Sequence, residues 1–346
     1  MLTGIFSLLV LYTLYIAAPL FVPMALAFLL NLLFAPLVRR LARVHVPPSV
    51  GAAFVLLALL GVVGGGAYLL SAPAAVWLDQ APQVLQEVEG RLSDLRQPIE
   101  SMRRASERVE EMTTADDDGV QTVEVRRPSI LEFVLGGTPE VLASAALVFF
   151  LLYFLLAAGD DFLLKLVKMG ANLEQKKRVV GVMRDIQSDI SHYLLTITVV
   201  NCCLGLIVAL ALFALGVPNP LLWGTMVALL NFAPYIGAAV SIVVLTLVGL
   251  LTFDSLGHAL LVPLTFFVIT TIEGQLVTPI VVGYRLELSA IVVFLAVVIC
   301  GWMWGIIGAL FAVPLIASLR IVCSYVQPLR PVAELLGTNG RDENQT

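Results

Sequence analysis

One acidic residue, Glu273, lies in the middle of a long apolar segment. Between Ser255 and Tyr284 no other acidic or basic side chain occurs, and His258 near one end is formally neutral. Placing a carboxyl group at the centre of a bilayer costs about 2.5 kcal/mol or more, so such a group usually faces a polar route or a partner. Glu273 could bind a proton or cation or hydrogen-bond a polar solute. The alternative is a structural carboxyl group satisfied by a neighbouring helix.

Polar and helix-breaking residues cluster around this acid. They are Thr270, Thr271, Gly274, Gln275, Thr278 and Pro279. Pro279 has no N–H and therefore leaves the carbonyl of Gln275 without its helical partner. Carbonyls freed in this way can line a cavity in a broken membrane helix. We expect Gln275 and the threonines to line a pathway for substrate or ions beside Glu273, and Gly274 and Pro279 to open the helix.

A second polar break lies earlier in the chain, where Asn231, Pro234 and Gly237 recur at steps of three inside an apolar stretch. Asn supplies donors and acceptors, and Pro and Gly permit the backbone to open. This pattern predicts a discontinuous helix or a re-entrant turn with Asn231 lining the pathway. A simple kink in a packed helix is the alternative. Paired interruptions of this kind are typical of transporter sites.

Glycines mark a third segment, in which Gly301, Gly305 and Gly308 would share one face of a helix. Small residues on one face favour close helix packing in lipid. Trp302 and Trp304 could instead belong to an interfacial belt, which would divide the segment into two half-spans.

Composition excludes an ordinary soluble domain. The chain has 346 residues, 59% hydrophobic and 13% charged, against about 25% charged residues in soluble proteins. It is therefore predicted to be an all-α polytopic membrane protein with the lipid bilayer as partner. A formal net charge of −5 argues against nucleic acid as a partner. No catalytic set, phosphate loop or metal-ligand spacing occurs, so we expect no enzyme activity, cofactor or metal.

About eight spans are predicted from the apolar runs. They cover residues 3–18, 20–37, 50–76, 138–158, 193–216, 221–251, 257–283 and 289–319. Residues 4–37 as one helix would be about 50 Å long, too long for a core of roughly 30 Å, and Pro19 and Pro23 favour a bend. Two spans are therefore preferred, with one long kinked helix as the alternative. The four cysteines are read as small packing residues without a disulfide.

Two polar segments interrupt the spans and set the organisation of the chain. The expected units are 1–76, 77–137, 138–158, 159–192, 193–322 and 323–346. The second is a small extracytoplasmic domain, in which apolar residues between Val84 and Met102 recur at helical spacing. That amphipathic helix could lie on the bilayer or form a seam between subunits. Basic residues in short connections predict that Arg39–Arg43, 165–184 and 320–330 are cytoplasmic, with both termini inside.

The chain resembles the autoinducer-2 exporter family of bacterial membrane proteins. The resemblance is carried by Tyr153–Leu156, Gly216–Pro218, Leu222–Gly224, Leu230–Gly237, Ile272–Glu273 with Pro279 and Gly283, and Gly305–Gly308 through Ala312–Pro314. It is weak over 77–137, and Ala290 follows Leu288–Ser289 where members often have Pro. The resemblance implies an inner-membrane homo-oligomer. It also implies a role in export of the autoinducer-2 signal or in sodium–proton exchange.

Together these features predict a secondary transporter that exports a small polar solute or cation. No phosphate loop for ATP hydrolysis occurs in the sequence, so transport would use an ion gradient. A sodium(lithium)–proton antiporter is the first alternative. An oligomeric scaffold without transport, acting through its outer helix and glycine faces, is the second.

Overall fold

The structure is a computed structural model that describes residues 9, 12–107, 139–159, 173–282 and 288–337. Within these ranges the chain is helical throughout, apart from turns and one isolated β-bridge between Leu288 and Gly337. Six helical segments are long and apolar enough to cross a membrane: 18–43, 48–77, 141–158, 181–214, 256–281 and 290–325. The predicted all-α polytopic membrane fold is confirmed.

The first group of helices contains α2 (Ala18–Arg43), α3 (Pro48–Glu107) and α5 (Pro139–Ala158). A turn at Ala17 precedes α2, and Pro19 lies in its first turn, where a missing N–H is tolerated. The bend predicted near Pro19 is therefore present, although half of the first predicted span, 3–18, lies outside the described residues. Buried Ala27, Val38, Ala52 and Leu152 hold the three helices together.

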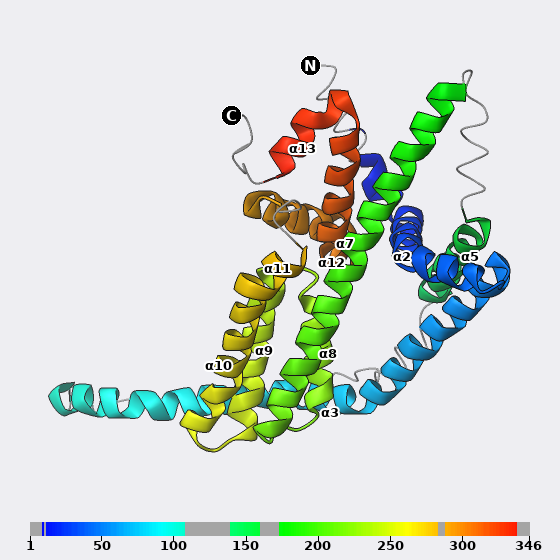
Figure 1. Ribbon diagram of the computed structural model, residues 1–346. Coiled ribbons are helices and arrows are strands. Elements are labelled where there is room, and N and C mark those ends of the chain that lie inside the picture. The colour runs from blue at the N-terminus through cyan, green and yellow to red at the C-terminus, as the bar shows by residue number, and fades with distance from the viewer. Residues whose placement is uncertain (1–8, 10–11, 108–138, 160–172, 283–287, 338–346) are drawn as a thin grey trace.

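The second group runs as four neighbouring helices: α7 (Leu173–Ala214), α8 (Pro220–Leu230), α9 (Ile236–Thr252) and α10 (Leu256–Ile272) (Figure 1). Two glycines set the contact between α7 and α8: a Cβ on Gly205 would lie 2.6 Å from the carbonyl oxygen of Gly224. Only glycine permits this approach, which lets the two backbones pack directly. Gly249 plays the same part against Ala259 of α10.

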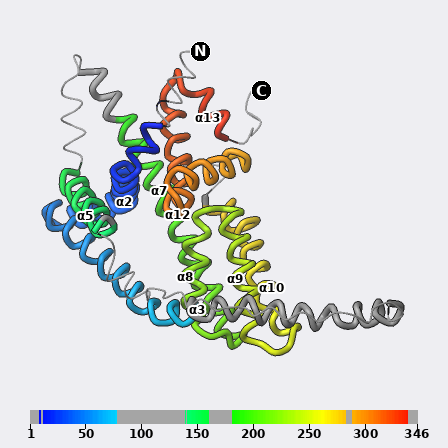
Figure 2. Tube along the Cα trace, turned by 180° about the vertical axis from the view of Figure 1, so that it is seen from behind, coloured from blue at the N-terminus to red at the C-terminus, as the bar shows by residue number. Residues whose placement is uncertain are grey.

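The segment 221–251 differs from the single span expected there. It forms two short helices, of 11 and 17 residues, or about 16 and 26 Å at 1.5 Å per residue, both shorter than a hydrocarbon core of about 30 Å. The chain rises along α8, turns and descends along α9 (Figure 2). The chain therefore reverses at the turn that Asn231, Pro234 and Gly237 predicted as one alternative, and a simple kink in one helix is not what is observed.

The last long helix, α12 (Ala290–Tyr325), is broken at Gly305, where φ is 67° and ψ is −151°. Only glycine adopts this conformation readily, so the helix divides into two parts that lie at a steep angle (Figure 1). The expectation that Gly301, Gly305 and Gly308 share one helix face is therefore wrong. Gly308 instead packs against the carbonyl of Cys300, across the break. The division of this segment into two parts is observed at Gly305, and its placement at a membrane interface stays a prediction.

Short helices complete the chain. A π-helical turn (η1, Glu273–Val277) and α11 (Thr278–Val282) follow α10 without interruption, and η3 (Gln327–Leu329) and α13 (Arg330–Leu336) follow α12. The Ser289 amide donates to the carbonyl of Leu336 at 3.1 Å. This bond and the Leu288–Gly337 bridge bring the start of α12 and the end of α13 together.

Candidate functional site

The hairpin between α8 and α9 turns through five residues, Asn231 to Tyr235. Asn231 ends α8, and its backbone N–H still donates to Val227 O at 2.9 Å. Gly237, in the first turn of α9, lies against the carbonyl of Leu230 so closely that a Cβ would overlap that oxygen. Glycine is required here because the last turn of α8 and the first turn of α9 meet backbone to backbone.

Tyr235 carries backbone strain at the tip of this hairpin. Its φ is 65° and its ψ is −57°, and the Ile236 amide donates to the Pro234 carbonyl at 2.8 Å. These values define the rare γ-turn with positive φ, which is strained for any side chain. Strain of this kind costs about 1–3 kcal/mol and persists where the surrounding structure enforces it, often at functional sites.

A pair of side-chain amides, from the buried Asn201 and the half-buried Asn231, connects the tip to α7. Asn231 Nδ2 donates to Asn201 Oδ1 of α7 at 2.9 Å. Asn201 is 0% exposed, and its own Nδ2 has no hydrogen-bond partner in the structure. An unsatisfied buried amide costs about 1–3 kcal/mol, so this group calls for an acceptor oxygen from water or from a solute.

Glu273 begins the π-helical turn that widens the helix before Pro279. The Thr278 amide donates to the carbonyl of Glu273, five residues back, and the Thr278 hydroxyl donates to Glu273 Oε1. Isolated π turns are rare and frequently mark functional positions. Both side chains are half-buried, so the carboxylate is held by its own helix and still reaches the surface of the protomer.

The other polar and helix-breaking residues predicted around Glu273 lie on α10, the π turn and α11, and they differ in how far they are exposed. Thr270 and Pro279 are half-buried, Gly274 and Gln275 are exposed, and the exposed Thr271 donates its hydroxyl to Phe267 O of the same helix. The structure thus pairs Asn231 with Asn201 and Glu273 with Thr278. In the described part of the chain, no hydrogen bond joins one pair to the other.

Asn201 was not predicted from the sequence as a site residue. Its signal is a single amide between Val200 and Cys202 in an otherwise apolar run, where a polar side chain needs a partner on another helix. Among the residues described, no group of three His, Cys, Asp or Glu side chains could hold a metal ion. All four cysteines are free. Cys300 and Cys323 are buried as expected of packing residues, whereas Cys202 and Cys203 are exposed on the protomer.

Comparison with known proteins gives the family. A family model described as "AI-2E family transporter" matches residues 5–326. The chain belongs to the AI-2E transporter family. It is 28% identical over 327 residues to YhhT of Escherichia coli (strain K12), provisionally named a transport protein, covering 93% of this chain and 89% of the relative.

Two further relatives support the same family. The chain is 26% identical over 320 residues to "AI-2 transport protein TqsA" of Escherichia coli (strain K12), covering 92% and 90% of the two chains. It is 27% identical over 306 residues to a provisionally named transport protein of Mycobacterium tuberculosis (strain CDC 1551 / Oshkosh), covering 86% and 80%. Family and helices together make this chain a multi-pass membrane protein with a transport role.

Proposed function

We propose that this AI-2E family member is a secondary transporter of the bacterial inner membrane that exports a small polar solute of the autoinducer-2 class. The observation that carries the proposal is the position of Glu273, the lone acid of its apolar segment, at the start of a π turn. A half-buried carboxylate beside a widened helix can take up and release a proton as the helix moves. The relative named for AI-2 transport supports the substrate class.

The side-chain amides of Asn201 and Asn231 supply the polar side of the same pathway in this proposal. Asn231 and the unsatisfied Asn201 amide can bind the hydroxyl or carbonyl oxygen of a solute without adding charge. Thr270, Thr271, Gln275 and Thr278 add polar groups on the other break, and Pro234, Gly237, Gly274 and Pro279 allow the two helices to open. In this proposal the end of α2 faces the cytoplasm, because basic residues at the end of a span, here Arg39, Arg40 and Arg43, favour that side.

The test is transport by the purified protein in proteoliposomes. One assay follows efflux of autoinducer-2 under an imposed proton gradient, and a second follows internal pH with and without a sodium or lithium gradient. Glu273→Gln, which keeps the shape and removes the charge, should abolish gradient-coupled flux while expression and folding persist. Glu334→Gln is the matched control, because Glu334 is an exposed acid of α13, outside the apolar segments.

The outcomes separate the candidate functions. Flux of autoinducer-2 that is lost only in Glu273→Gln supports the proposal. Flux that survives Glu273→Gln at every pH makes this acid structural. A pH change that depends on sodium or lithium, without efflux of the signal, identifies the antiporter instead. A stable oligomer without any flux favours the scaffold. A homo-oligomer is expected in each case, because Gly61, Gly64 and Gly65 of α3 have no neighbour within 4 Å in the described protomer and could contact another copy.

A further inference from the structure

A cavity of about 190 Å³ lies where four helix segments meet. Its walls come from the last turns of α2, the first residue of α3, the end of α5 and the early part of α7. The lining residues are Asn31, Ala35, Val38, Arg39, Ala42, Pro48, Leu155, Leu156, Gly159 and Gln187. This volume is several times the share of one water molecule, about 30 Å³. The space can therefore accommodate a small polar group as well as water.

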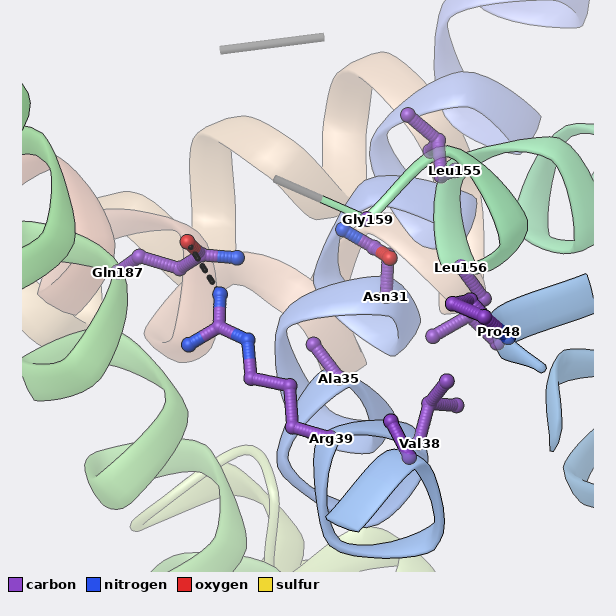
Figure 3. A pocket seen from close by; sticks show the side chains of 10 residues that line it. Asn31, Ala35, Val38, Arg39, Pro48, Leu155, Leu156, Gly159 and Gln187 are labelled. Atoms are coloured by element: carbon purple, nitrogen blue, oxygen red, sulfur yellow. Dashed lines mark hydrogen bonds between the residues drawn. The ribbon is translucent and has the colours of Figure 1, made fainter. Parts of the chain in front are cut away.

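Polar groups gather on one side of this cavity. Arg39 Nη2 donates to Gln187 Oε1 at 2.8 Å, and Gln187 is one of the partners of this guanidinium. The amide of Asn31 lies near the same space, while Val38, Pro48 and Leu156 line the other side (Figure 3). Asn31 is 9% exposed, so its side-chain amide is a buried polar group that borders the cavity.

The chemistry of the lining favours a negatively charged ligand. Arg39 is the one ionisable side chain among the lining residues, and none of them is acidic. A guanidinium presents five N–H groups in a planar fork that matches phosphate oxygens, and amide NH₂ groups add neutral donors. The bond to Gln187 helps to hold the Arg39 head group at the cavity, and a guanidinium with five N–H donors can serve several acceptors at once.

The location of the cavity indicates where such a phosphate would come from. Four apolar segments, 18–43, 48–77, 141–158 and 181–214, begin or end around it. Arg40 and Arg43 are further basic residues in the last turn of α2, the helix that supplies Arg39. Basic residues at the ends of spans lie at the depth of lipid head groups and attract anionic lipids.

We propose that this cavity binds the phosphate group of an anionic phospholipid, held by Arg39 with the amides of Asn31 and Gln187. The apolar residues on its other side suit the glycerol and the first methylenes of the same lipid. The site is independent of the transport pathway proposed above, because none of its lining residues belongs to the α8–α9 tip or the π turn.

The experiment measures lipid binding to the purified full-length protein in detergent. Native mass spectrometry counts bound dioctanoyl phosphatidylglycerol, with dioctanoyl phosphatidylcholine as the zwitterionic control and sodium phosphate as the free anion. Arg39→Gln should weaken phosphatidylglycerol binding about tenfold, the effect expected for loss of one charge-assisted hydrogen bond. Arg40→Gln removes the same charge at the next residue, which does not line the cavity, and should weaken binding much less than Arg39→Gln.

A second variant keeps the charge and removes the space. Ala35→Leu places a larger side chain into the cavity and should also weaken phosphatidylglycerol binding, which gives a result even if Arg39→Gln folds poorly. Equal losses in Arg39→Gln and Arg40→Gln would reduce the effect to general surface charge and overturn the site. Unchanged binding in Arg39→Gln and Ala35→Leu would overturn it too. Sodium phosphate that binds as well as the lipid would overturn the lipid assignment.

Discussion

At the scale of single residues, the side-chain amides of Asn201 and Asn231 bear on both the packing of α7 against α8 and the proposed transport pathway. Asn231 ends α8 at the hairpin tip, and its side-chain Nδ2 donates to Oδ1 of the buried Asn201 of α7. A purely structural pair would satisfy both amides, yet Asn201 Nδ2 remains without an acceptor. In a low-dielectric interior such a donor is costly, which is a reason to expect water or a solute there.

Replacing the two amides separately and together distinguishes a structural role from a transport role. Asn201→Leu or Asn231→Leu alone should lower stability by about 1–3 kcal/mol, because the remaining amide loses its partner. The double variant should be destabilised less than the sum of the two, because no unpaired amide is left. Thermal unfolding in detergent measures both effects.

Transport is then measured in the same variants. If the amides line the pathway, flux falls in the double variant even though its stability recovers. A double variant that is both stable and fully active in proteoliposomes would show that the pair serves packing alone. Thr225→Val is a suitable control, because the Thr225 hydroxyl donates to Leu221 O of its own helix.

At the scale of elements, the α8–α9 hairpin is held in a strained conformation at one residue. Tyr235 has φ 65° and is 61% exposed, so its ring contributes little burial to offset the strain. Tyr235→Gly should leave stability unchanged or raise it by about 1 kcal/mol, since glycine adopts positive φ without penalty. Tyr68→Gly, at an 81% exposed position within α3, should instead lower stability by up to about 1 kcal/mol.

Thermal unfolding of the two glycine variants gives the comparison directly. Equal destabilisation by both substitutions would mean that the γ-turn is not a site of strain. A loss of transport in Tyr235→Gly without a loss of stability would show that the rigid tip, rather than the tyrosine ring's packing, matters to the pathway.

The same elements show what the sequence could and could not predict. The spacing of Asn231, Pro234 and Gly237 indicated a break, because these residue types weaken a helix locally. Whether the chain kinks or reverses depends on the contact of Gly237 with Leu230, which only the folded hairpin creates. Gly305 fitted a helix face as well as it fitted a break. Asn201 could be recognised as a candidate site residue only in the folded protein, where the packing of α7 against α8 brings it to Asn231.

At the scale of the whole molecule, α7 connects the two groups of helices. It packs closely on α8 through Gly205 and Gly224, and Ser191 donates to Leu32 O of α2 at 2.5 Å. Near the end of α12, the Tyr325 hydroxyl donates to Asp189 of α7 at 2.7 Å. A movement of α7 would therefore change the surroundings of the amide pair, of the cavity lined by Arg39 and of the end of α12 together.

One face of α3 has no partner within the described protomer. Added Cβ atoms at Gly61, Gly64 and Gly65 would meet nothing within 4 Å, and only 6% of the apolar window of 48–77 is buried. These glycines share one face of the helix, and small residues in lipid favour direct helix contact. Gly64→Leu should therefore leave the protomer folded and disrupt the homo-oligomer proposed for this protein.

Mass photometry in detergent, which reports the mass of the assembly, measures this outcome. Gly181→Leu is the matched control, because Gly181 is also open within the protomer but lies on α7, outside the face formed by the three glycines. A smaller assembly for Gly64→Leu alone, with unfolding temperatures within a few degrees of each other, supports contact between α3 helices of neighbouring copies. An assembly that keeps its mass in both variants places the subunit contact elsewhere, and a monomeric unsubstituted protein removes the homo-oligomer from the proposal.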